Sequence, residues 1–142
     1  MISIDFNQTL ALSGAQLTEK LIANIEDEIN QEVGSNFDGQ ISALLVSDHE
    51  IKKLNRIYRH KDEITDVLSF SYLEEKRREE NIGDIVISYD QALRQAQNND
   101  IELELTDLLV HGVLHVLGYD HELPEDAKIM FSVQDRIVAN AL

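Results

Sequence analysis

The spacing of three histidines constrains this 142-residue chain more than any other feature of its sequence. His111, His115 and His121 follow the pattern H-x3-H-x5-H. The first two are four residues apart, so a regular α-helix projects them from one face with Cβ atoms roughly 5 to 6 Å apart. A continuing helix would direct His121 to another face, but Gly118 can adopt the positive φ that ends a helix and reverses the chain. The pattern therefore predicts a helix that ends near Gly118 and a loop that returns His121 to the other two.

Three imidazoles gathered in this way are suited to hold one metal ion. Three histidines with a fourth position left to water are typical of catalytic zinc sites, whereas structural sites have four protein ligands. The chain has no cysteine, which excludes thiolate ligands, disulfides and thiol nucleophiles. We expect one Zn²⁺ per chain on His111, His115 and His121; a histidine pair alone would more often be hydrogen-bonded core residues. Asp120 is either an acceptor that orients a ligand ring or a turn former.

Apolar patterns along the rest of the chain predict a single α+β domain over residues 1–142, a small mixed sheet flanked by helices. Alternating apolar residues at 2–6 and short apolar runs at 41–46, 67–72 and 85–88 indicate strands, the last of them after a turn at Gly83. Residues 74–81 are almost wholly polar or charged and predict an exposed loop or frayed helix end.

Helices are predicted between and after these strands. An apolar residue at every fourth position indicates an amphipathic helix that ends at Gly34. Ser47 and Glu50 have capping-box spacing, Thr106 begins the strongly apolar histidine helix, and Pro124 fits the first turn of a last helix. The residues expected to face the core are Leu17, Leu21, Ile25, Ile29 and Val33 on the first helix, Ile51, Leu54 and Tyr58 on the second, and Ile129, Val133 and Ile137 on the last.

The charge of the chain is unevenly distributed. The formal net charge is -15, which argues against broad adhesion to nucleic acid. Eight of the twelve Lys and Arg residues nevertheless fall between Lys52 and Arg78, and five of these lie between Lys52 and Lys61. An acidic body with one basic band can hold a polyanion locally and reject it elsewhere. The alternative is an ordinary solvated helix face.

Arg59 is the candidate of greatest interest within the basic band. Its planar guanidinium can hold two phosphate oxygens and stabilise charge that develops on phosphorus. The alternative is an ion pair with Asp62 or Asp66. Arg56 and Lys61 are candidates to extend a phosphate-binding track, and the three charges from Lys76 to Arg78 are expected to be solvated.

The histidine pattern also bears on the class of reaction. Metallopeptidases of the H-E-x-x-H-x-x-G-x-x-H type have the same spacing, with a glutamate general base after the first histidine. Gly112 occupies that position here, so the group that takes a proton from water and delivers it to a leaving amine is absent. Phosphodiesters and other esters have better leaving groups and tolerate this loss more readily.

Three blocks of sequence together resemble the YbeY family of bacterial rRNA-maturation endoribonucleases. They are L-N-x-x-Y-R-x-K-D-x-x-T-D-V-L-S-F at residues 54–70, G-D-I-V-I at 83–87 and H-G-x-L-H-x-x-G-Y-D-H at 111–121. Ile64 departs from the proline that is usual in the family before Thr-Asp, which affects only the rigidity of that loop. The family's metal ligands fall on His111, His115 and His121, and its catalytic arginine falls on Arg59.

The resemblance implies a zinc-dependent, single-strand-specific endoribonuclease that acts in 3′-end maturation of small-subunit (16S) rRNA and in ribosome quality control. The expected partners are ribosomal RNA and proteins of the small ribosomal subunit, with no DNA and no membrane. No leader pattern or apolar run of membrane-spanning length is evident, so the expected location is the cytoplasm. The alternatives are a non-catalytic ribosome-assembly factor with a structural metal and a metalloprotease-like hydrolase.

Overall fold

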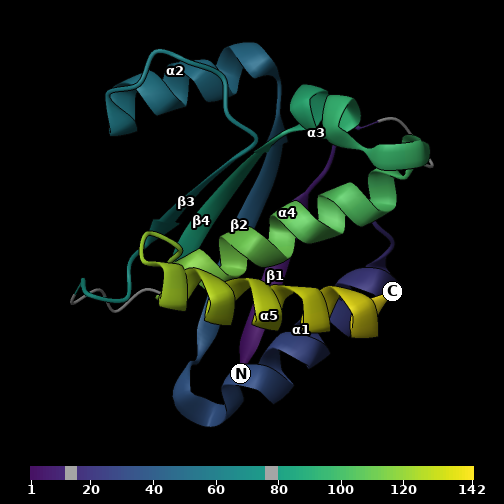
Figure 1. The fold of residues 1–142 in the computed structure, drawn as a ribbon, viewed down its shortest axis with the longest axis vertical. Coiled ribbons are helices and arrows are strands. Elements are labelled where there is room, and N and C mark those ends of the chain that lie inside the picture. The colour runs from purple at the N-terminus through teal and green to yellow at the C-terminus, as the bar shows by residue number, and fades with distance from the viewer. Residues whose placement is uncertain (12–15, 76–79) are drawn as a thin grey trace.

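A four-stranded sheet in the order β1-β2-β4-β3 is the centre of the computed structural model, which describes residues 1–11, 16–75 and 80–142 (Figure 1). Strands β1, β2 and β4 are mutually parallel, and β3 runs antiparallel to β4. The prediction of a mixed sheet within an α+β fold is therefore confirmed. The strand bounds are Ile2–Asn7 for β1, Gly39–Val46 for β2, Val67–Ser71 for β3 and Asn81–Ser88 for β4.

Five α-helices and two short 3-10 helices, Gly34–Asn36 and Gln97–Asn99, complete the described part of the chain. Thr18 caps the first helix and Ser47 caps the second, each by accepting a hydrogen bond from a backbone N–H in the first turn. Pro124 stands at the start of the last helix, as predicted. The helix bounds are Glu19–Val33 for α1, Asp48–Arg59 for α2, Tyr89–Gln95 for α3, Ile101–Val116 for α4 and Pro124–Ala141 for α5.

The two faces of the sheet are covered unequally. Helices α1, α4 and α5 lie on one face of the sheet (Figure 1). They enclose the main core together with alternate residues of the strands, among them Ile41, Ile85 and Ile87. On the opposite face, the described residues form a small cluster beneath α2, which consists of Val46, Ile51, Leu68 and Val86. Helix α2 is therefore held by few buried residues, whereas α4 is at the centre of the molecule.

Two glycines allow α4 to approach β4 closely. A Cβ atom added at Gly83 would lie 2.4 Å from a methyl group of Val116, and one added at Gly112 would lie 2.8 Å from Cγ2 of Ile85. Real Cβ contacts are almost never so short, so larger residues would push helix and strand apart. Ser71 also donates from its hydroxyl to the carbonyl oxygen of Val116 at 2.7 Å. The end of α4 that carries the histidines is thus held against the sheet.

Several details of the sequence-based prediction are wrong. Helix α4 begins at Ile101, capped by Asp100, and Thr106 lies inside it with its hydroxyl bonded to the carbonyl of Glu102. Strand β4 begins at Asn81, so Gly83 lies within a strand. Helix α3 was not predicted. Of the residues predicted to face inward, Tyr58 and Ile129 are instead more than half exposed.

The first helix matches its prediction closely. Leu21, Ile25, Ile29 and Val33 form its buried stripe, and Leu17 is buried just before it begins. The charges from Lys76 to Arg78 lie outside the described residues. Within residues 1–11, 16–75 and 80–142, no helix combines the length and apolar character needed to cross a membrane.

Candidate metal centre

The reversal predicted at Gly118 is present at the end of α4. Gly118 has φ of +101° and its N–H donates to the carbonyl of His115 at 3.1 Å. The N–H of Tyr119 donates to the carbonyl of Leu114 at 2.9 Å, which completes the paired hydrogen bonds of a Schellman motif. A Cβ atom at Gly118 would meet nothing within 4 Å, so the backbone angle and not lack of space favours glycine there.

This turn places His121 beside His111 and His115. One ring nitrogen from each histidine lies within 4.8 Å of the others, and the ring centroids are 4.7 to 5.5 Å apart. Zn–N bonds of about 2.0 to 2.1 Å in a tetrahedral site put ligand nitrogens about 3.4 Å apart. Small rotations of the histidine side chains would bring their ring nitrogens to this separation. The donor set therefore fits a zinc ion. His121 is exposed, which leaves the cluster open on one side.

The electrostatic surroundings favour the neutral form of His115. Burial lowers the pKa of His115, and the nearby His111 and His121 lower it further, while Asp120 acts in the opposite direction. Only an uncharged imidazole has a lone pair free for a metal ion. His115 is thus favoured in the form that can bind a metal ion without first releasing a proton.

Asp120 proves to be a turn former. Its Oδ1 accepts hydrogen bonds from the backbone N–H groups of His121 at 2.7 Å and Glu122 at 3.3 Å. A side chain that forms a hydrogen bond with a ligand ring is Gln134 on α5, whose Oε1 lies 2.8 Å from Nδ1 of His111. Sequence reasoning missed Gln134. The sequence does contain a signal for it: Gln134 is a polar residue at a position of the apolar stripe of α5, one turn after Met130 and three residues before Ile137.

A cleft of about 730 Å³ extends from the histidines to the segment between α2 and β3. One wall is formed by His111, His115, His121 and the turn after α4, and the other by residues from Asn55 to Ser69. Arg59 and Lys61 both line the same cleft as the three histidines. Arg56 is exposed and is not among the lining residues. The structure thus brings two of the three basic candidates to the predicted metal site.

Arg59 is held in place by contacts that leave much of its guanidinium free. Its Nη2 donates to the carbonyl oxygen of Ser69 at 2.5 Å, and its Cζ lies 5.0 Å from the centroid of the Phe70 ring. Arg59 is exposed and, among the described residues, forms no ion pair with Asp62 or Asp66. The alternative of a buried ion-pair partner is therefore wrong, and the remaining N–H groups are available to an anion.

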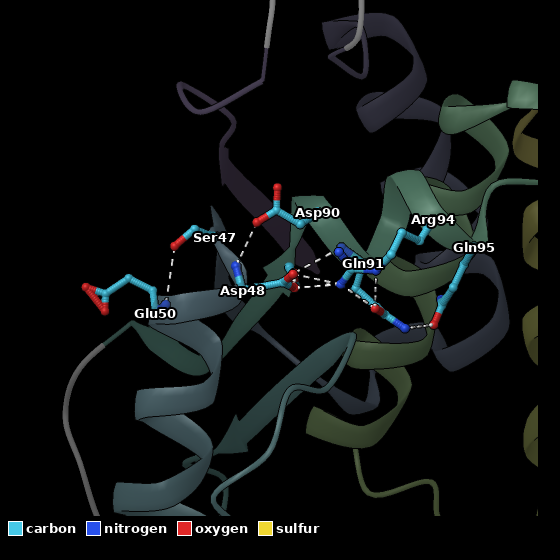
Figure 2. Close-up of polar contacts among 8 residues, drawn as sticks. Ser47, Asp48, Glu50, Asp90, Gln91, Arg94 and Gln95 are labelled. Carbon is cyan, nitrogen blue, oxygen red and sulfur yellow. Dashed lines mark hydrogen bonds and ion pairs between the residues drawn. The ribbon is translucent and has the colours of Figure 1, made fainter.

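Helix α2, which carries Arg59 at its last turn, is anchored at its first turn by polar contacts with α3 (Figure 2). The backbone N–H of Asp48 donates to Asp90 at 2.8 Å. The carboxylate of Asp48 accepts from Ser88 at 2.9 Å and pairs with Arg94 at 2.8 Å. These bonds compensate for the sparse apolar packing of α2 and fix the wall of the cleft that contains Arg59.

A side chain at position 112 would point away from the cleft. Gly112 is buried, and an added Cβ atom would be directed at the side chain of Ile85 in β4. Gly112 is also not among the residues that line the cleft. The position that holds the glutamate base in H-E-x-x-H peptidases therefore has neither the side chain nor the space for one.

Comparison with known proteins agrees with the geometry of the site. The family model described as endoribonuclease YbeY matches residues 4–141. The endoribonuclease YbeY of Persephonella marina is 42% identical over 135 residues, covering 91% of this chain and 87% of that protein. That of Lysinibacillus sphaericus is 39% identical over 153 residues, covering 97% and 94%.

A third relative and a solved structure extend the comparison. The endoribonuclease YbeY of Anaeromyxobacter dehalogenans is 48% identical over 95 residues, which are 66% of this chain but only 49% of that protein. The solution structure of TM1509 from Thermotoga maritima matches with a TM-score of 0.59 and 33% identity over 99% of this chain and 89% of that one. The sequence match over nearly the whole chain shows that this protein belongs to the endoribonuclease YbeY family.

Proposed function

We propose that this protein is a zinc-dependent endoribonuclease that cuts single-stranded RNA, and that it acts in the cytoplasm in 3′-end maturation of 16S rRNA and in ribosome quality control. Its partners are then ribosomal RNA and proteins of the small subunit. The observation that carries the proposal is a single cleft lined both by Arg59 and Lys61 and by His111, His115 and His121.

The residues of the cleft divide the chemistry between two walls. His111, His115 and His121 would hold the ion, which when bound supplies a Lewis acid beside the scissile phosphate. Arg59 would bind the phosphate through the N–H groups not used by Ser69 and offset charge that develops on its oxygens. Lys61 would hold a neighbouring phosphate as a point charge. Arg56, outside the cleft lining, would contact RNA only beyond the scissile group.

The acidic surface supports selectivity for a strand that enters this cleft. Phosphate contacts require local cations, and a net charge of -15 opposes binding elsewhere on the protein. A peptidase is disfavoured because Gly112 is packed against Ile85 and offers no general base. A structural brace is disfavoured because the third ligand, His121, is exposed and the cluster opens into the cleft.

The test is cleavage of single-stranded RNA and of an unstructured peptide by the purified protein. We expect RNA to be cut and the peptide to remain intact, with RNA cleavage lost on chelation and restored by zinc. A 5′-phosphate and 3′-hydroxyl in the products would indicate attack by water, and a 2′,3′-cyclic phosphate attack by the ribose 2′-hydroxyl.

The matched control is His115→Ala, purified in the same way to exclude a contaminating ribonuclease. A two-histidine site holds zinc weakly, so this variant should lose most of its metal after dialysis and lose RNA cleavage with it. Equal cleavage by the variant would refute the nuclease proposal and favour an assembly factor. Full metal occupancy in each of His111→Ala, His115→Ala and His121→Ala would refute the ligand assignment.

A further inference from the structure

Gln134 joins the first histidine of the cluster to a carboxylate that the proposed mechanism does not use. Its Oε1 lies 2.8 Å from Nδ1 of His111, and its Nε2 donates to Oδ1 of Asp107 at 2.8 Å. Asp107 and His111 are four residues apart and lie on the same side of α4, while Gln134 reaches them from α5. Gln134 is 5% exposed, so the amide makes these two bonds where water has little access.

The chemistry of the three groups imposes one direction on this chain of hydrogen bonds. An ionised carboxylate accepts hydrogen bonds and cannot donate, so Asp107 requires the NH₂ group of Gln134 to face it. The amide oxygen must then face His111 and can only accept. Nδ1 of His111 must therefore carry the proton, and its lone pair is on Nε2.

The stacking of Phe131 constrains the same ring in a second way. Phe131 lies three residues before Gln134 on α5, and its ring is 6.0 Å from the rings of both His111 and His121. The interplanar angles are 25° and 23°, so one aromatic face supports two histidines. Stacking limits the tilt of the His111 ring, and the hydrogen bond to Gln134 limits its rotation about the side-chain axis.

We propose that Asp107 and Gln134 are positioning residues that set the tautomer of His111, so that its Nε2 atom is available to the metal ion before the ion arrives. The inference rests on the proposed metal site but not on RNA cleavage. Removing such a partner of a ligand histidine typically lowers metal affinity by roughly 10- to 100-fold.

The direct test is the ring tautomer of His111 in metal-free protein, read from ¹⁵N chemical shifts at about pH 8, where imidazoles are neutral. The wild-type ring should carry its proton on Nδ1. Gln134→Met keeps the size of the side chain but removes the acceptor, so the proton should move toward Nε2. Gln134→Glu keeps an acceptor at His111 and should preserve the wild-type tautomer.

Zinc affinity, measured by competition with a chelator, provides the second readout. Gln134→Met should bind zinc roughly 10- to 100-fold more weakly. Asp107→Asn should also bind zinc more weakly, because an amide at position 107 lets Gln134 turn around and present its NH₂ group to His111. Asp135→Asn removes the same charge from an exposed neighbour of Gln134 and should leave both the tautomer and the affinity unchanged.

Three results would overturn the inference: a wild-type His111 ring protonated on Nε2, a Gln134→Met variant with wild-type tautomer and affinity, or equal losses of affinity in Asp107→Asn and Asp135→Asn. The wild-type tautomer requires no variant, so poor folding of a mutant leaves the inference testable. A wild-type protein that binds zinc but does not cut RNA would refute the proposed nuclease and leave this inference standing.

Discussion

The close approach of α4 to β4 leads to a quantitative expectation for Gly112→Ala. In a helix interior alanine is more favourable than glycine by about 1 kcal/mol, so an unobstructed site would gain stability. Here the new Cβ would lie 2.8 Å from Cγ2 of Ile85, and also 3.1 and 3.2 Å from Cδ1 and Cγ1. Overpacking of this kind typically costs about 1 to 3 kcal/mol. The net change should be a loss of between zero and about 2 kcal/mol, from the difference of these two terms.

A double-mutant cycle with Ile85→Ala isolates the steric part of this change. Ile85→Ala alone should cost about 2 to 5 kcal/mol, because it empties a core position, but it also removes all three atoms that oppose the new Cβ. In that background Gly112→Ala should stabilise the protein by about 1 kcal/mol, which gives a coupling free energy of about 1 to 3 kcal/mol in urea unfolding.

Gly118→Ala is the matched control for the cycle. Its cost comes from the positive φ and not from a neighbouring side chain, so it should be the same in both backgrounds. If Gly112→Ala changes the free energy of unfolding equally with and without the Ile85 side chain, α4 does not pack closely on β4 at this point and the steric argument is refuted.

Two further expectations concern the charged residues Arg59 and Glu104. Arg59→Glu should abolish RNA cleavage, and Arg59→Lys should restore it only in part because an ammonium cannot bind two phosphate oxygens in a fork. Metal content and melting temperature should stay unchanged in both variants. Unfolding of the Glu variant would show that Arg59 has a structural role instead. Burial raises the pKa of Glu104, with Asp107 and Asp66 adding to the effect and Gln95 opposing it. A raised pKa in the folded state means that the stability contribution is present below the unfolded value of 4.5 and is lost as pH rises through the folded value. Glu104→Gln should therefore raise the free energy of unfolding at neutral pH and lose this advantage at about pH 4, and a less stable variant at neutral pH would refute the assignment.

The histidine cluster could be predicted because its geometry is local. Four residues of helix place His111 and His115 together, and the positive φ of Gly118 returns the chain within three more residues. The buried stripe of α1 was predictable for the same reason, since one repeating pattern defines both the helix and its inner face. Neither prediction depends on the strand order or on any contact with a distant segment.

Helix α3 and the first turn of α4 could not be predicted, because tertiary contacts decide them. Helix α3 has seven residues and one buried side chain, Ala92, and its apolar pattern is too short to distinguish from a loop. It is stabilised by the Ser88 cap and by the bond between Arg94 and Asp48 of α2. Tyr58 is exposed for a related reason: α2 covers only part of its face of the sheet, and the Tyr58 ring lies edge-on to Phe70 at the margin.

The two walls of the cleft differ in how far apart in sequence their determinants lie. The histidine wall requires only the eleven residues of helix and turn from His111 to His121. The position of Arg59 depends instead on two other elements: β3, where Ser69 and Phe70 contact its guanidinium, and α3, which anchors the first turn of α2. Gln134 is also a long-range determinant, since it lies 23 residues from His111 and 27 from Asp107. A polar residue in an apolar stripe indicates that some buried partner exists, but its identity follows only from the packing of α5 on α4. Substitutions that loosen α2 should therefore impair the phosphate contact while sparing metal binding, whereas those that loosen α5 should impair metal binding first.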